Sequence, residues 1–336
     1  MNAPEQVPAG FLDALTRLVA LDTVSPLDPT RWRACATELA RHGCRPVGAG
    51  LFGYGQPSAP VWLYGHVDTK PPGVMDEWGS DPFTLTRRAG RWVGLGVSDS
   101  KFQLLNALAV ANPQRHFVLV DTCEEYDGDG AAAAYLTEHA PDTLVICDGA
   151  RGAEVDTYAG YQGQADGTIH LATGHPVRHP ARPGGDVSGL LGQLLAQGAM
   201  SVPRFTLTGL SAPATTRSLA LQRASVRFDI RFGPSDEPAV RRFLEGWPHE
   251  LRQWMYPVAG TQPAAVDGIA FGGLAPFSNR LGRHGPPPVR RVVVVPGADP
   301  DNRNHQPDEF IRPGQANRHR NTLQRVVRQL EENSDD

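Results

Sequence analysis

Five residues of this chain have the side chains expected of a site that holds two metal ions. The candidate motifs are Gly-His-Val-Asp-Thr at 65–69, Gly-Leu-Gly-Val-Ser-Asp-Ser-Lys at 94–101, Cys-Glu-Glu at 123–125, Cys-Asp-Gly at 147–149 and Asn-His-Gln at 304–306. The candidate ligands within them are His66, Asp99, Glu125, Asp148 and His305. Two imidazoles and three carboxylates form the set expected of two divalent metals that share a bridging carboxylate. The sequence therefore predicts a di-metal hydrolase.

The types of ligand narrow the choice of metal. Imidazole and carboxylate ligands suit zinc, cobalt or manganese, and a set without cysteine argues against a purely structural zinc site. Two such ions about 3.5–4 Å apart can activate a water molecule and polarise the carbonyl group that it attacks. We therefore expect two divalent metal ions as cofactors, with zinc as the first choice and cobalt or manganese as alternatives.

Two further carboxylates in the same motifs have the positions of assisting groups. Asp68 lies two residues after His66 and, if the strand continues, on the same side of it. It could then accept a hydrogen bond from the second imidazole nitrogen and fix the tautomer of the ring. Glu124 precedes the candidate ligand Glu125 and points to the opposite side on this interpretation. A carboxylate beside the metals could take a proton from the attacking water and pass it to the leaving amine.

Short apolar runs precede most of the candidate ligands along the chain. They are Val61–Tyr64 before His66, residues 116–120 before the Glu pair, 143–147 before Asp148, and 291–296 before the His305 loop. Such runs, bounded by Gly, Pro and Asp, indicate strands buried on both faces, as in a parallel sheet covered by helices. Ligands in such folds gather beyond the carboxyl ends of the strands. The predicted fold class is α/β, with a mixed, largely parallel sheet and helices on both faces.

In order and wording, the motifs resemble those of the co-catalytic zinc aminoacylase and carboxypeptidase family. That family includes acetylornithine deacetylase, succinyl-diaminopimelate desuccinylase, glutamate carboxypeptidase and several dipeptidases. Its Gly-His-x-Asp-Thr motif corresponds to Gly65–Thr69, its Gly-x-Gly-x-x-Asp-x-Lys motif to Gly94–Lys101, its Glu pair to Glu124-Glu125, and its closing His-x-x-x-Glu to His305–Glu309. The resemblance covers essentially the whole chain, and five motifs in sequence make it specific.

The resemblance implies a role for each residue of the site. It implies that Asp99 bridges the two metals, that Glu124 is the general acid and base, and that Asp68 orients His66. One departure concerns Asp148, because the deacetylases and carboxypeptidases have Glu at this position. Asp is more typical of the dipeptidases and aminopeptidases in the family.

Two residues outside the metal motifs and one within them are candidates for substrate binding. His179 resembles the family histidine that reaches a neighbouring active site, although the match needs a one-residue insertion and His175 competes with it. Arg280 lies near the position where relatives place an arginine for the substrate carboxylate, which suits the bidentate chemistry of that side chain. Lys70 could bind an anionic substrate group, but a solvated loop lysine is the preferred interpretation.

The hydrophobic pattern changes near residue 163. Residues 168–172, 204–208 and 219–232 alternate as in a half-exposed antiparallel sheet, and 189–199 and 238–247 have helical spacing. This insert, 164–266, resembles the smaller lid domain of the family, which often carries the dimer contact. We therefore expect a catalytic metal-binding domain formed by 1–163 and 267–336, an inserted lid domain, and a homodimer through that lid.

The composition excludes several other classes of protein. The chain has 336 residues, 20% of them charged, a net charge of −4 and no basic block, so nothing points to nucleic acid. No apolar stretch approaches the length of a membrane span, and the first ten residues lack the order of a signal peptide. The four cysteines do not have metal-site spacing, and reduced thiols predict a cytoplasmic protein.

These observations predict a metal-dependent amidohydrolase or metallopeptidase. The preferred substrate is a small N-acyl amino acid, and the alternative is a short peptide cleaved by a dipeptidase, aminopeptidase or carboxypeptidase. Asp148 favours peptides, whereas the short lid and compact chain favour a small acyl substrate. A hypothesis from another class is a non-catalytic relative that binds metal or ligand. The presence of Glu124 counts against it, because binding alone does not require a general base.

Overall fold

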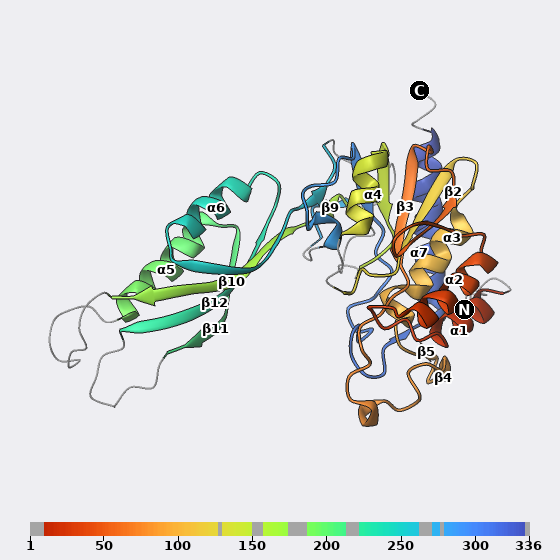
Figure 1. Ribbon diagram of the computed structural model, residues 1–336, viewed down its shortest axis with the longest axis horizontal. Coiled ribbons are helices and arrows are strands. Elements are labelled where there is room, and N and C mark those ends of the chain that lie inside the picture. Colours follow the sequence, from red (N-terminus) through yellow and green to blue (C-terminus); the bar gives the residue numbers. More distant parts are fainter. Residues whose placement is uncertain are drawn as a thin grey trace, which may run out of the picture. The chain divides into compact units, whose positions relative to one another are not determined.

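The computed structural model describes residues 10–126, 130–149, 157–173, 187–212, 222–261, 271–275 and 279–332 (Figure 1). The chain divides into two compact units. The first comprises Met1–Gly160, Ala259–Ala275 and Pro287–Asp336, and the second Tyr161–Val258 and Pro276–Pro286. The limits expected from the sequence differ from these units mainly in placing 276–286 with the catalytic domain.

The first unit contains an eight-stranded sheet in the order β1-β2-β6-β3-β7-β16-β8-β15. Its four central strands, β6, β3, β7 and β16, are parallel neighbours and correspond to the four apolar runs of the sequence. The flanking strands β2 and β8 pair antiparallel with this centre, so the sheet is mixed. The strands are β1 (Arg45–Gly48), β2 (Leu51–Gly55), β3 (Val61–His66), β6 (His116–Asp121), β7 (Thr143–Ile146), β8 (Thr157–Tyr158), β15 (Phe271–Gly272) and β16 (Arg291–Val294).

Helices cover both faces of this sheet. On one face, alternate strand residues such as Leu63, Val118 and Val293 join a buried core with helices α1, α2, α3 and α7. On the other face, the Trp62 ring lies 5.7 Å from the Tyr135 ring of α4. Figure 1 shows α4 on one side of β3 and α3 and α7 on the other. The predicted fold class, α/β with helices on both faces of a largely parallel sheet, is confirmed. The helices are α1 (Phe11–Val19), α2 (Pro29–Arg41), α3 (Phe102–Val110), α4 (Ala131–His139) and α7 (Pro313–Glu332).

Local sequence signals explain where two of these helices form. The Asp28 side chain accepts hydrogen bonds from the main-chain nitrogens of Thr30 and Arg31, and Pro29 opens α2, as is usual at a helix start. In α7 a stripe at helical spacing is buried against the sheet. The buried stripe consists of Leu323, Val326, Val327 and Leu330.

The second unit is built on a four-stranded antiparallel sheet in the order β11-β12-β10-β13. Buried residues alternate with more exposed ones along β12, so one face of the strand is buried, as the sequence predicts for a half-exposed sheet. Helices α5 and α6 contribute Leu194, Val240 and Phe243 to a separate core with this sheet. The elements are β10 (Gly163–Ala172), α5 (Val187–Ser201), β11 (Arg204–Ser211), β12 (Arg223–Phe232), α6 (Glu237–Glu245) and β13 (His249–Met255).

Several short elements complete the described structure. They are β4 (Thr86–Arg88), β5 (Arg91–Val93) and β17 (Phe310–Ile311) in one small sheet, β9 (Gly160–Tyr161) and β14 (Val258–Ala259) in another, and the single turns η1 (Met75–Glu77), η2 (Val97–Lys101) and η3 (Arg280–Gly282). Among the described residues, no helix is both long and apolar enough to cross a membrane.

Candidate metal centre

The candidate ligands come mostly from the carboxyl ends of the central parallel strands. His66 is the last residue of β3, Glu125 follows β6, Asp148 follows β7, and His305 follows β16 in a longer loop. Because β6, β3, β7 and β16 are parallel neighbours, their carboxyl ends lie at one edge of the sheet. Asp99 instead lies in the η2 turn before α3, a helix that packs against β3.

Three groups of described residues could hold a metal ion: His66 with Glu124 and Glu125 forms one, and the remaining two contain all five candidate ligands between them. One of these two is His66, Asp99 and Asp148, and the other is Asp99, Glu125 and His305. Within each group the ligand atoms lie within 4.8 Å of one another. Asp99 belongs to both of the latter groups, which is the arrangement that a bridging carboxylate requires.

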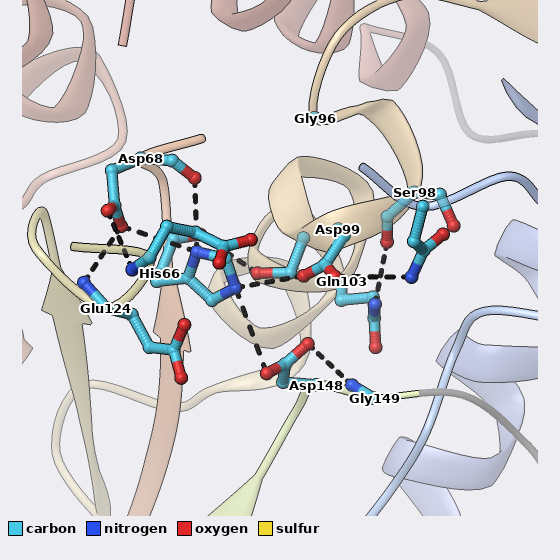
Figure 2. A network of polar contacts seen from close by, with 12 residues as sticks. His66, Asp68, Gly96, Ser98, Asp99, Gln103, Glu124, Asp148 and Gly149 are labelled. Carbon is cyan, nitrogen blue, oxygen red and sulfur yellow. Dashed lines mark hydrogen bonds and ion pairs between the residues drawn. The ribbon is translucent and has the colours of Figure 1, made fainter. Parts of the chain in front are cut away.

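The two oxygens of Asp99 face two different imidazoles. Oδ1 lies 3.1 Å from Nε2 of His66, and Oδ2 lies 3.2 Å from Nε2 of His305. Oδ2 of Asp148 lies 3.8 Å from the same His66 nitrogen, and Oε1 of Glu125 lies 2.6 Å from the His305 nitrogen. Figure 2 shows the His66 ring pointing toward Asp99 and Asp148. Each half of the centre therefore has one imidazole, one carboxylate of its own and one oxygen of Asp99.

Asp68 holds the far side of the His66 ring. Nδ1 of this buried ring lies 3.2 Å from the main-chain oxygen of Asp68 and 3.4 Å from its Oδ1 atom. Two acceptors at Nδ1 favour the tautomer with its proton there, which leaves the Nε2 lone pair directed at Asp99 and Asp148. The Asp68 carboxylate thus lies beside the His66 nitrogen that points away from Asp99 and Asp148.

Asp68 also positions the Glu pair, a contact that the sequence did not predict. Its Oδ1 accepts from the main-chain nitrogen of Glu124 over 3.1 Å, and its Oδ2 accepts from that of Glu125 over 2.9 Å. In the parallel pairing of β3 with β6, His66 lies opposite Asp121. The residues that follow the two strands, Asp68 and the Glu pair, therefore lie close together. That pairing becomes visible only once the strand order is known.

The Glu124 carboxylate is not tied to a neighbouring side chain. Among the described residues no hydrogen bond to this carboxylate is present, and Figure 2 shows it pointing away from Asp68, toward the side where Asp148 lies. Burial, followed by repulsion from Glu125 and Asp148, raises the pKa of Glu124 well above its usual range. A carboxyl group whose pKa is raised in this way suits a general acid and base.

Lys70 contacts the centre directly. Its Nζ atom lies 2.6 Å from Oε2 of Glu125, on the opposite side of the carboxylate from His305. The interpretation of Lys70 as a merely solvated loop residue is therefore wrong, although 38% of its side chain is exposed. Glu125 offers one oxygen to the cluster while Lys70 holds the other.

The carboxylates of the cluster favour a positive charge at the nitrogens of both imidazoles. Burial alone would lower the pKa of His305, but its hydrogen bonds with Asp99 and Glu125 raise it to about 10. For His66, too, burial acts downward, and the contacts with Asp68 and Asp99 outweigh it and raise the pKa well above the usual value. A site that stabilises a proton at these nitrogens would also stabilise a divalent cation there. The donor atoms and their electrostatics thus fit two divalent metal ions.

Arg280 and the two candidate histidines come from other parts of the sequence than the metal-centre residues. Arg280 opens η3 in the second unit, whereas the metal-centre residues all belong to the first unit. His179 and His175 lie outside the described residues. The roles of these three residues stay predictions.

The fold has counterparts among solved structures. A metallo-carboxypeptidase from Sulfolobus solfataricus aligns over 96% of this chain and 99% of its own with a TM-score of 0.63, at 14% sequence identity. Human carnosine dipeptidase 1 aligns over 94% and 95% of the two chains, with a TM-score of 0.58 and 17% identity. At these identities the likeness concerns the fold alone.

The chain is also similar in sequence to enzymes of known reaction. The chain is 27% identical over 268 residues to a succinyl-diaminopimelate desuccinylase from Bordetella avium, which covers 68% of this chain and 70% of that protein. The Bordetella pertussis desuccinylase is 30% identical over 228 residues, which is 64% of this chain and 57% of the relative. The match thus spans 57–70% of the length of these relatives.

The family model gives the broadest match. It covers residues 62–329, the segment that carries all five candidate ligands, Asp68 and Glu124. The family resemblance expected from the motifs is confirmed, as is the prediction of a hydrolase for amide or peptide bonds. The chain belongs to peptidase family M20/M25/M40 and is a metal-dependent hydrolase of that family.

Proposed function

We propose that this protein hydrolyses the amide bond of a small N-acyl amino acid with the help of two divalent metal ions. The observation that carries the proposal is the position of Asp99, which offers one oxygen to the His66 group and the other to the His305 group. The similarity to succinyl-diaminopimelate desuccinylases supports an acyl substrate over a peptide.

In this proposal His66, Asp99 and Asp148 hold one ion, and Asp99, Glu125 and His305 hold the other. The ions, with zinc as the first choice and cobalt or manganese as alternatives, would supply Lewis acidity toward the water and the scissile carbonyl. Each of the terminal ligands Glu125 and Asp148 presents one oxygen inward, because Lys70 and the Gly149 amide bind the other oxygen.

Two carboxylates of the protein, Glu124 and Asp68, handle the proton transfers and hold the site in place. Glu124 takes a proton from the attacking water and delivers it to the nitrogen of the departing amine. Its pKa, raised by burial and neighbouring carboxylates, allows the same group to hold that proton between the two steps. Asp68 keeps the Nδ1 proton of His66 in place and fixes the main chain of the Glu pair throughout.

One observation favours a second candidate function, cleavage of a short peptide. The carboxylate after β7 is Asp148, which resembles the dipeptidase and aminopeptidase pattern of the family, whereas its deacetylases have Glu. A dipeptidase would also have to bind a free ammonium group, so the two candidates differ in the substrates that they accept.

The test is amine release by zinc- or cobalt-loaded protein on matched N-acetyl amino acids, N-succinyl amino acids and free-amine dipeptides. Turnover confined to the acyl substrates, and lost in Glu124→Gln, is the expected result. Turnover confined to dipeptides would establish the second candidate. A protein that holds two metals and cleaves neither panel would contradict both and favour the metal- or ligand-binding hypothesis.

The proposal extends to assembly and location. We infer a cytoplasmic homodimer whose contact lies in the insert at 164–266, with β11 as the candidate surface. In the described part of the chain this strand lies at the edge of its sheet with β12 as its one partner, and Leu207 is 39% and Leu210 54% exposed. Light scattering of the purified protein, with Leu210→Asp as the variant, tests the dimer.

A further inference from the structure

Glu309 is a buried carboxylate that lies four residues beyond His305, just before β17. It is 1% exposed, and its main-chain oxygen accepts a hydrogen bond from Gly94 over 3.0 Å. The segment is thus hydrogen-bonded to strand β5 and its following turn, because Phe310 also pairs with Val93 in the small sheet. The side chain of Glu309 points in the same direction, toward the turn that follows β5.

That side chain binds three main-chain nitrogens of the Asp99 turn. Oε2 accepts from Gly96 over 3.1 Å, and Oε1 accepts from Ser98 over 2.7 Å and from Asp99 over 3.0 Å. Three converging amides form the kind of backbone cradle that proteins use to bind anions. Here the bound anion is the carboxylate of Glu309, which lies 210 residues after Asp99 in the chain.

The turn needs an external anchor because its own backbone is irregular. Asp99 and Ser100 have non-helical dihedral angles within η2, and Gly96 has a φ of +71°. A Cβ atom at Gly96 would lie 2.3 Å from Cγ2 of Thr69, so the chain passes close to the His66 motif there. Gln103 fixes the opposite side of the turn by donating to the Ser98 oxygen over 2.8 Å (Figure 2).

We propose that Glu309 is a positioning residue for the metal centre, which holds the Asp99 carboxylate between His66 and His305 by binding three amides of its turn. The proposal rests on the proposed metal-ligand roles of those residues. One segment then performs two tasks, since it supplies His305 as a ligand and Glu309 as the anchor of Asp99. Both halves of the centre depend on the anchor because Asp99 belongs to both.

The decisive variant is Glu309→Gln, which keeps the size of the side chain but replaces one acceptor oxygen with a donor. An amide group facing main-chain N–H groups leaves at least one of them without an acceptor. Groups that orient metal ligands change metal affinity by about 10–100-fold when mutated. We therefore expect Glu309→Gln to bind zinc about ten-fold or more weakly, measured by competition with a chromophoric chelator.

The control is Glu38→Gln, which removes another buried carboxylate. Glu38 of α2 is 6% exposed and pairs with Arg17 over 2.8 Å, and it contacts none of the candidate ligands. We expect wild-type zinc affinity for it. The absorption spectrum of bound Co²⁺ gives a second readout, because a displaced Asp99 alters the coordination geometry in Glu309→Gln but not in Glu38→Gln.

Wild-type zinc affinity and an unchanged Co²⁺ spectrum in folded Glu309→Gln would overturn the proposal. If that variant does not fold, hydrogen exchange of the wild-type protein decides, since the amides of Gly96, Ser98 and Asp99 must be protected. Rapid exchange at these three amides would also overturn it. Failure of the wild-type protein to bind any metal would instead contradict the proposed function.

Discussion

Oδ1 of Asp68 accepts a hydrogen bond from the main-chain nitrogen of Glu124 over 3.1 Å, although 56 residues separate them. The same carboxylate lies 3.4 Å from Nδ1 of His66. The orientation of a metal-binding imidazole and the position of the proposed acid and base therefore depend on one buried group. This dependence has a measurable consequence.

Replacing Asp68 by Asn should impair metal binding and turnover together. The Asn amide offers one acceptor where Asp68 now offers two to the Glu124 and Glu125 amides, so one of these amides loses its partner. We expect a loss of about 10–100-fold in kcat/KM, accompanied by weaker zinc binding. Asp22→Asn, at an exposed carboxylate, is the control. Full activity in Asp68→Asn would contradict the positioning role.

The two members of the Glu pair should behave differently. Glu124→Gln is expected to keep both metals and lose about a hundredfold or more in kcat, because it removes a proton-transfer group. Glu125→Gln is expected to lose metal, because Oε1 of Glu125 faces His305. Metal analysis and kinetics on both variants test this. Equal metal content in the two variants would show that the assignment of roles is wrong.

Metal stoichiometry should depend on which ligand is removed. Since Asp99 belongs to both groups, Asp99→Ala should retain neither metal at micromolar concentrations. Of the two groups that share Asp99, His66→Ala and His305→Ala each remove a ligand from one, so each should retain about one metal per chain. Elemental analysis after gel filtration measures the ratio. Two tightly held metals in Asp99→Ala would exclude a shared carboxylate.

Lys70 should favour substrates with a second negative charge. Its side chain is 38% exposed and its ammonium group lies beside Glu125, so it could contact an acyl group that ends in a carboxylate. We expect Lys70→Met to weaken the selection of N-succinyl over N-acetyl amino acids by a factor of about 5, as for a charge pair of about 1 kcal/mol. Lys70→Arg should keep the selection. An equal loss on both substrates would assign Lys70 to the metal centre alone.

A histidine away from the centre should make the protein sensitive to acid. His319 is buried on α7, where Nε2 lies 3.0 Å from the Val295 oxygen and Nδ1 lies 3.1 Å from Nδ2 of Asn106. Burial is the main cause that lowers its pKa to about 4, from 6.5 in an unfolded chain.

The sign of the effect follows from proton binding. Between pH 6.5 and 4 the unfolded chain binds a proton at His319 that the native protein does not, so stability falls as the pH falls through this range. The contribution of His319 changes the free energy of unfolding by about 1.4 kcal/mol per pH unit in this range, and this slope is absent above pH 6.5. Urea unfolding of the wild-type protein and His319→Gln at several pH values measures the difference. Parallel pH profiles for the two proteins would contradict a neutral buried His319.

The sequence predicts the parts of this molecule whose cause is local. The four central strands are recognisable as apolar runs because both of their faces are buried, and Asp28 marks the start of α2 by its side-chain chemistry. The sequence does not predict the edge strand β1 or its inner neighbour β2. β1 is largely exposed, so no hydrophobic pattern marks it.

The contacts of the site are less accessible to sequence reasoning than its residues. The types of the five candidate ligands are visible in the motifs, but Asp99 comes from a turn and not from a strand end. The contacts of Lys70 with Glu125 and of Glu309 with the Asp99 turn join segments 55 and 210 residues apart. Such contacts depend on the strand order and on the path of loops, which no local pattern encodes.

The partner of β7 has a consequence for folding. Thr143 of β7 pairs with Arg291 of β16, and the whole segment 161–258 of the second unit lies between them. During synthesis the edge of β7 that pairs with β16 therefore stays unpaired until the intervening residues and β16 have been translated. Pairings so distant in sequence slow folding, and an open apolar edge invites association with other chains. Nascent chains that stop before β16 should accordingly depend on chaperones to stay free of aggregates.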